Sequence, residues 1–212
     1  MRQEEYVYEE KRIGQYHVKV VQDSDPENPR TAWDNFGHMI CFVNRYSIGD
    51  KHNMSGDELK EIIESENTFS LPVFVYIHSG ITVNTSGFSC PWDSGQAGYI
   101  YVTKEEIRKE YGVKKISAKL TKRVYDILKS EVETYDQYLT GSVYGFVVEH
   151  DEKGVVDSCS GFYGSVRDCL QEGIASAEYA RTQDISEHVK TLKSYIKNRV
   201  PVIYRLPCPI KQ

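Results

Sequence analysis

Apolar side chains recur along this chain with two different periods, and the periods separate the expected strands from the expected helices. Residues 16–20 alternate between apolar and polar positions, which is typical of a half-buried strand. Residues 72–78 form an almost continuous apolar run, which predicts a strand that is buried on both faces. Further strands are expected at 38–43, 97–102 and 201–205, and a hairpin is expected at 143–149 and 155–159.

Helical spacing is clearest between residues 117 and 139, where a single apolar stripe predicts the longest helix. The stripe consists of Leu120, Val124, Ile127, Leu128, Val132, Tyr135 and Leu139. Capping boxes predict the start of two shorter helices, one at Ser55 with Glu58 and one at Thr103 with Glu106. Two more helices are expected at about 166–180 and 184–198.

These elements follow one another without a regular strand–helix–strand rhythm, so they favour an α+β fold over a doubly wound sheet. A mixed or antiparallel sheet packed by about four to five helices would accommodate them. The chain of 212 residues is long enough for one sizeable core and short for two. Residues 1–212 are therefore predicted to form a single domain.

The composition is that of an ordinary globular protein, with 40% apolar and 27% charged residues. No stretch approaches the roughly 20 apolar residues of a membrane span, and the first residues lack the apolar run of a signal peptide. The five cysteines are scattered without a CxxC pair, which is typical of reduced thiols. We therefore expect a cytoplasmic protein that contacts no membrane and holds neither a metal nor a cofactor.

The segment from 79 to 96 is interpreted as one long loop. It is the best candidate for a binding site, because loops of that length are uncommon in compact domains unless they are functional or disordered. Its aromatic residues argue against disorder. The candidate residues in and beside it are His78, Ser79, Thr82, Phe88, Cys90, Trp92, Asp93 and Gln96. Two interpretations stay open, a ligand pocket walled by Trp92 and a surface loop packed on itself. A nucleophile and base made by Cys90 and His78 is a further alternative.

Charge is distributed unevenly, which adds two candidate surfaces. Residues 104–123 carry eight basic side chains and three acidic ones, so they form either a phosphate-binding face or a solvated helix surface. Lys114, Lys115 and Lys119 are the candidate nucleic-acid contacts. An acidic face could instead imitate phosphates towards the basic groove of a nuclease. Its candidate residues are Asp57, Glu58, Glu61 and Glu64.

One alternative comes from a resemblance to ADP-ribosyltransferases of the histidine–tyrosine–glutamate class. The strings YIHSG at 76–80 and GYIY at 98–101 are similar in order to the motifs of that class, and Glu149 ends a later strand. The resemblance implies a small enzyme that acts on NAD or a nucleotide. His78 and Tyr99 or Tyr101 would then orient the ligand. Glu149 would activate the attacking group.

Six segments together resemble a family of proteins from phages and integrated mobile elements of gut anaerobes. They are WDN (33–35), RYSIGD (45–50), HSGIT (78–82), FSCPWDSGQ (88–96), EVETYDQYLTG (131–141) and DSCSGFYG (157–164). FSCPWDSGQ is the most specific of these strings. The chain departs from the family pattern at Ile77, where an Asp commonly precedes the histidine, so an Asp–His dyad built from those neighbours would be broken here.

The resemblance to mobile-element proteins implies a genomic setting, in which small accessory proteins frequently act on host defence by binding. We therefore expect a non-enzymatic protein of the bacterial host cytoplasm whose partner is a macromolecule, either a bacterial protein or a ribonucleoprotein. The partner that this interpretation favours is a defence nuclease. The protein would inhibit it in the manner of anti-restriction or anti-CRISPR proteins. Nucleic-acid binding and the enzyme of ADP-ribosyltransferase type remain the alternatives, and the oligomeric state is not defined by the sequence.

Overall fold

The computed structural model describes residues 6–199, and these residues form five α-helices and eight β-strands. The expected α+β class is confirmed, and the strands form two antiparallel sheets rather than one. The chain divides into two compact units. Of the described residues, unit 1 holds 6–21, 145–159 and 166–199, and unit 2 holds 22–144 and 160–165. The strand expected at 201–205 lies outside the described residues.

Unit 2 contains a four-stranded sheet, here called sheet B, whose strands are all antiparallel to their neighbours. Its order is β3 (His38–Cys41), β6 (Ser94–Thr103), β4 (Thr68–Ile77) and β5 (Ile81–Asn84). The apolar run at 72–78 becomes the second half of β4, next to the centre of the sheet. Pro72 is tolerated there because β5 pairs only with Phe74–Ile77, which leaves the start of β4 with one neighbour.

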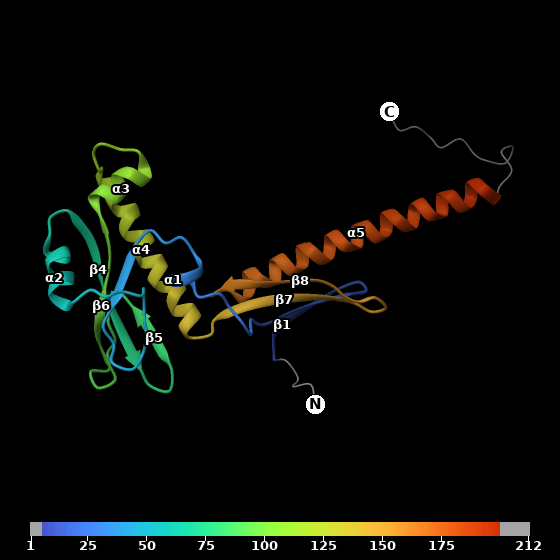
Figure 1. Ribbon diagram of the computed structural model, residues 1–212. Helices are drawn as coiled ribbons and strands as arrows, with labels where there is room; N and C mark the ends of the chain where they lie inside the picture. The colour runs from blue at the N-terminus through green and yellow to red at the C-terminus, as the bar shows by residue number, and fades with distance from the viewer. Residues whose placement is uncertain (1–5, 200–212) are drawn as a thin grey trace. The chain divides into compact units, whose positions relative to one another are not determined.

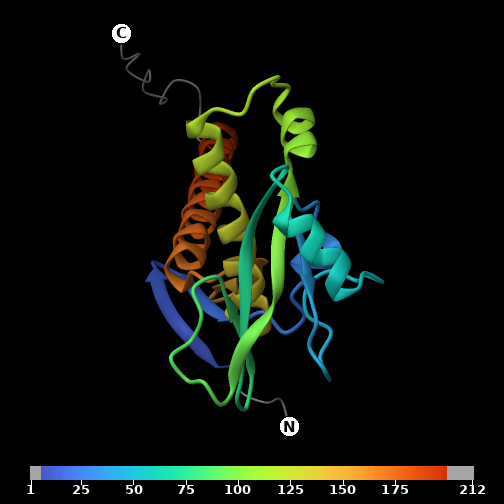
Figure 2. The same ribbon diagram turned by 90° about the vertical axis from the view of Figure 1, so that its left-hand side faces the viewer.

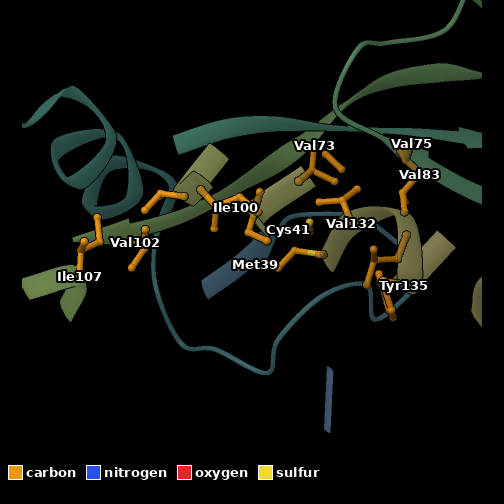
Figure 3. Packing of buried hydrophobic residues seen from close by; sticks show 14 residues of the cluster. Met39, Cys41, Val73, Val75, Val83, Ile100, Val102, Ile107, Val132 and Tyr135 are labelled. Carbon is orange, nitrogen blue, oxygen red and sulfur yellow. The ribbon is translucent and has the colours of Figure 1, made fainter. Parts of the chain in front are cut away.

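One face of sheet B is covered by α4 (Ala118–Leu139), the longest helix of unit 2. Its predicted stripe is confirmed, because Val124, Leu128 and Val132 are fully buried. They pack with inward-facing side chains of all four strands, as Figure 3 shows. This main core includes Met39, Cys41, Val73, Val75, Val83, Ile100, Val102 and Tyr135.

The other face of sheet B is covered by α2 (Gly56–Glu64), so the sheet lies between two helices (Figures 1 and 2). Leu59 of α2 packs against Ile40 and Tyr101, whose strand neighbours Met39 and Ile100 point to the α4 face. The predicted capping box at Ser55 and Glu58 is present and sets the start of the helix.

Two shorter helices complete unit 2. The capping box at Thr103 and Glu106 starts α3 (Lys104–Tyr111), as predicted, and Gly112 ends it in the left-handed conformation. The segment between β2 and β3 contains α1 (Pro29–Ala32). Asn28 caps α1, and Pro29 fits its first turn because that turn needs no backbone N–H.

Sheet B requires a glycine where β6 passes β3. A Cβ atom added to Gly98 would lie 1.9 Å from the carbonyl oxygen of Ile40, a distance that no side chain can adopt. Gly98 thus allows the two strands to approach closely, next to the site of a bulge where β6 shifts its register against β4.

A buried arginine links α1 and α4 with the segments that flank β3. The side chain of Arg30 is 1% exposed and forms two hydrogen bonds of 2.8 Å to Asp50. Nη1 of Arg30 donates to Glu131 at 2.8 Å, and Nη2 donates to the carbonyl of Gly37 at 2.7 Å as well as to Asp50. Burial disfavours the charged guanidinium, but the bonds and charges of Asp50 and then Glu131 outweigh that effect and raise the pKa of Arg30.

Most of the second sheet, here called sheet A, belongs to unit 1. Its order is β1 (Val7–Ile13), β2 (Tyr16–Gln22), β7 (Val143–His150) and β8 (Gly154–Tyr163). The expected hairpin of β7 and β8 is confirmed, whereas β1 was not predicted, because its sequence VYEEKRI is mostly polar and its side chains are exposed. Ion pairs reinforce the sheet, and Lys19 meets Glu149 at 2.5 Å.

A single helix, α5 (Val166–Arg199), replaces the two helices expected at about 166–180 and 184–198. Residues 181–184 are polar, but they contain neither Gly nor Pro, so nothing in the backbone ends the helix there. The first half of α5 packs on sheet A. Gly173 allows this close contact, because a Cβ atom there would lie 2.6 Å from Val18.

Replacing Arg30 by Ala should lower the free energy of unfolding by about 3–5 kcal/mol, because Asp50 and Glu131 would be left without their counter-charge. The matched control is Arg108→Ala in the same unit, which removes an exposed arginine and should change stability by less than about 0.5 kcal/mol. Urea unfolding followed by circular dichroism measures both. Equal effects of the two substitutions would contradict the role assigned to Arg30.

Candidate functional site

The candidate residues gather at one end of sheet B, although the segment that carries them is not the single loop expected. Strand β5 divides it into a three-residue turn (78–80) and a loop (85–93), and β6 begins at Ser94. The turn follows the end of β4 and the loop precedes the start of β6, and these strand ends are hydrogen-bonded through Ile77 N and Asp93 O at 2.9 Å. Turn and loop therefore lie side by side at the end of the sheet that is opposite α3 (Figures 1 and 2).

His78 and Asp93 form an ion pair across this end of the sheet. The distance from His78 Nδ1 to Asp93 Oδ2 is 3.1 Å. The carboxylate beside His78 thus comes from Asp93, the last residue of the loop before β6, and not from position 77. The imidazole side chain is 65% exposed, so the pair is open to solvent rather than enclosed as in a catalytic site. Across residues 6–199, no hydrogen bond joins His78 to Cys90.

Aromatic rings support this end of the sheet. Tyr76 stacks on His78 with ring centroids 6.1 Å apart, and Phe88 packs on Tyr76 at 5.6 Å. Sequence analysis missed the role of Tyr76. Its position two residues before His78 was the available signal, because residues i and i+2 of a strand share a face.

Trp92 projects from the loop into solvent. Its exposed fraction is 91%, the largest of any large hydrophobic side chain in the described part of the chain. The interpretation that this tryptophan packs within its own loop is therefore wrong, and so is that of a pocket wall. Ser79 in the neighbouring turn adopts a left-handed φ of 57°, which is uncommon for a residue other than glycine.

The remaining candidates of this segment have structural roles. Thr82 Oγ1 donates to Asp136 of α4 at 2.5 Å, and the amide of Val83 donates to the same oxygen at 2.8 Å. These bonds fasten β5 to the helix. Gln96 donates to the carbonyl of Gly98 at 3.3 Å, and the carbonyl of Cys90 accepts a hydrogen bond from the hydroxyl of Ser94.

The acidic candidates lie on the exposed side of α2, away from this end of the sheet. Glu61 lines a cleft of about 530 Å³ together with Thr68 and Thr103, whereas His78 follows the opposite end of β4. Two of the four acids have local partners. Glu58 accepts the backbone N–H of Ser55, and this bond holds the pKa of the carboxyl below its usual range. Glu64 pairs with Lys60.

The basic residues gather at the α3 end of sheet B, and we call this set the basic end. It consists of Lys104, Arg108, Lys109, Lys114, Lys115, Lys119, Lys122 and Arg123. Lys104 is half-buried and the others are exposed. None of the eight forms an ion pair with another of residues 6–199. Arg123 lies 5.6 Å from the ring centre of Tyr111.

The arrangement expected for an ADP-ribosyltransferase is not assembled within unit 2. Tyr101 pairs with Ser70 in the sheet, eight residues along β4 from His78, which is roughly 26 Å of strand. Tyr101 is also buried, and burial raises the pKa of its hydroxyl. Tyr99 pairs with Pro72 and packs towards α2. Glu149 belongs to unit 1, where it is paired with Lys19.

The described residues give little support for metal binding or for catalysis by a buried cysteine. Between residues 6 and 199, no three His, Cys, Asp or Glu side chains gather as a metal site would require. Burial raises the pKa of Cys41 to about 12 and that of Cys169 to about 11, so both thiols are held in the unreactive protonated form. The same part of the chain contains no helix with the length and apolar character needed to cross a bilayer.

No protein-family model, curated protein or solved structure matches this chain. The functional interpretation therefore rests on the geometry described above.

The exposure of Trp92 can be measured, because the chain has only one other tryptophan, Trp33. Trp33 is 42% exposed and its ring packs against Tyr163 at 4.9 Å. Acrylamide should therefore quench the fluorescence of Trp33→Phe, which retains Trp92, more steeply than that of Trp92→Phe. Equal quenching, or the reverse order, would contradict the position of Trp92.

Proposed function

We propose that this protein is a non-enzymatic accessory protein of a phage or mobile element that binds a bacterial macromolecule through the exposed end of sheet B. The contact residues are His78, Ser79, Phe88, Trp92 and Asp93, here called the tip surface. The partner that we favour is a nuclease of a host defence system, which the protein would inhibit by occupying it.

The observation that carries this proposal is the 91% exposure of Trp92 on a loop whose backbone is held in place. Asn84 accepts the amides of Ser86 and Gly87 at 3.0 Å and 2.7 Å, which fixes the start of the loop. The bond between Ile77 and Asp93 fixes its end. Exposing a tryptophan has no benefit for folding, whereas a tryptophan on an ordered loop loses little entropy on binding and is the residue most typical of binding hot spots.

The chemistry around the tip surface also favours binding over catalysis. The His78–Asp93 pair is open to water, and the register of sheet B separates it from both tyrosines of the enzyme hypothesis. A hydrogen-bonded polar pair beside an aromatic anchor is a common arrangement at a protein–protein interface, where polar groups set orientation and partner choice. The choice of a defence nuclease rests on the resemblance to mobile-element proteins.

Substituting Trp92 by Ala should weaken partner binding by about 2 kcal/mol or more, which is roughly 30-fold in Kd, without changing the thermal stability of the protein. The matched control is Tyr179→Ala, which removes another exposed aromatic side chain from unit 1. Wild type and both variants would be expressed in bacteria that carry restriction or CRISPR systems, and phage plating would be counted.

Protection by the wild type and by Tyr179→Ala, together with its loss in folded Trp92→Ala, supports the proposal. A wild-type protein that protects phage against none of a broad panel of defence systems and captures no host protein would refute it.

Nucleic-acid binding is the second candidate, and the observation that favours it is that no side chain of the basic end forms an ion pair with another of residues 6–199. Seven of these eight side chains are exposed, and lysines that have no carboxylate partner remain available for phosphates. The tyrosine beside Arg123 adds an aromatic surface of the kind that contacts bases. The acidic side chains Glu105, Glu106 and Glu110 on α3 oppose this function by repelling phosphates.

If the basic end binds nucleic acid, reversing the charge of Lys114, Lys115 and Lys119 to Glu should weaken binding to every sequence. The dependence of log K on log salt should become shallower by about 2–3, since each lost phosphate contact contributes about 0.9. The same reversal at Lys11, Lys51 and Lys60, which are exposed elsewhere, is the control. Absence of binding by the wild type in filter or gel-shift assays at low salt would exclude this candidate.

A further inference from the structure

The second half of α5 lies free of the sheet that holds the first half. Up to residue 184 the helix is fastened to sheet A, and the last such contacts are made by Asp184, which accepts hydrogen bonds from Tyr16 at 2.6 Å and Lys153 at 2.5 Å. Every residue from 185 to 199 is exposed. The helix nevertheless continues for these fifteen residues.

These residues carry an apolar stripe that the sequence pattern did not single out. Ile185, Val189, Leu192 and Ile196 follow one another at intervals of four, three and four, which places them on one side of the helix. Their exposed fractions are 54%, 40%, 47% and 52%. The opposite side carries Glu187, Lys190 and Ser194. This distribution is that of a helix with an apolar face and a solvated face.

The stripe has the heptad spacing of helices that pack along one another in a coiled coil. Val189 and Ile196 take one core position of the heptad, and Ile185 and Leu192 take the other. A lone helical segment of this length is only marginally stable in water, and most helices depend on the packing of their apolar face. The segment therefore calls for a partner that covers the stripe.

We propose that a second copy of this chain covers it, with the two helical segments antiparallel. In the antiparallel arrangement, the stripe of one copy is complementary to the same stripe of the other copy. Ile185 of one copy meets Ile196 of the other, and Val189 meets Leu192, so one two-fold axis generates four apolar layers. A contact of this kind is closed, because each copy uses the same surface.

Charge selects the antiparallel direction over the parallel one. The segment carries Glu187 near its start and is basic further along, at Lys190, Lys193, Lys197 and Arg199. Parallel helices would set the basic ends beside each other. Antiparallel helices set the start of one copy, which carries Glu187, beside the basic end of the other, so that the like charges lie far apart. This inference does not depend on the tip surface or on the function proposed for it.

The first experiment measures the mass of the protein in solution. Light scattering after gel filtration should give about 49 kDa for the wild type, twice the 24.4 kDa of the chain. Leu192→Glu should give the monomer mass, because it places two charges in adjoining layers of the pair. Val189→Glu is the second variant and should behave in the same way. Ser194→Glu, on the opposite side of the same helix, should remain dimeric.

The second experiment determines the direction of the helices. Ile185→Cys and Ile196→Cys are prepared as separate proteins, mixed and treated with a short thiol crosslinker, and the linked peptides are identified by mass spectrometry. Antiparallel pairing predicts links between residue 185 of one protein and residue 196 of the other. A wild type that stays monomeric at high concentration overturns the proposal, as do a Leu192→Glu protein that remains dimeric and links that join 185 only to 185.

Discussion

The fold of unit 2 depends on a single buried cation. Arg30 lies in α1, Asp50 follows β3, and Glu131 is in the middle of α4, so one guanidinium joins its own helix to two segments that lie 20 and 101 residues away in the chain. The two carboxylates also serve the backbone, because Asp50 accepts the amide of Met39 at 2.8 Å and Glu131 accepts that of Phe36 at 2.7 Å. A buried ion pair adds little net stability when it is complete, but alternative packings would leave its charges unpaired. Its main effect is therefore to specify one register of α4 against sheet B.

This network gives a structural role to several of the strings that the sequence analysis singled out. Asp50 belongs to RYSIGD and Glu131 to EVETYDQYLTG, and Asp136 of the latter fastens the end of HSGIT. Trp33 of WDN packs on Tyr163 of DSCSGFYG with ring centroids 4.9 Å apart. These polar and aromatic residues hold the unit together. The exceptions are at the end of sheet B, where the string FSCPWDSGQ gives Asp93 to His78 and exposes Trp92. We place the proposed function at this end of sheet B, because Trp92 is exposed there and does not hold the unit together.

Much of the fold could be predicted from local signals. Ser55 with Glu58 and Thr103 with Glu106 start helices here and could be identified from the sequence, because their hydrogen bonds are made within four residues. Contacts between distant residues could not be predicted in this way. Strand β5 has only four residues and owes its position to Asp136, and nothing near Arg30 in the sequence identifies its partners. The sequence singled out the segment that holds the candidate residues, but it did not predict their geometry. Whether Trp92 faces a pocket or solvent depends on how β5 divides the segment.

The binding surfaces proposed here suit a protein that acts by association. In unit 2 the tip surface and the basic end lie at opposite ends of sheet B, so the same rigid sheet could present two different contacts without interference. A dimer through α5 would carry two copies of each. A partner that is itself symmetric or repeated, as a nucleic acid is, would then be held at two places, and the second contact would form at the high effective concentration that the first creates. Under that arrangement a single tryptophan anchor of modest affinity suffices for each copy, which fits a tip surface that is small and lacks an enclosing pocket.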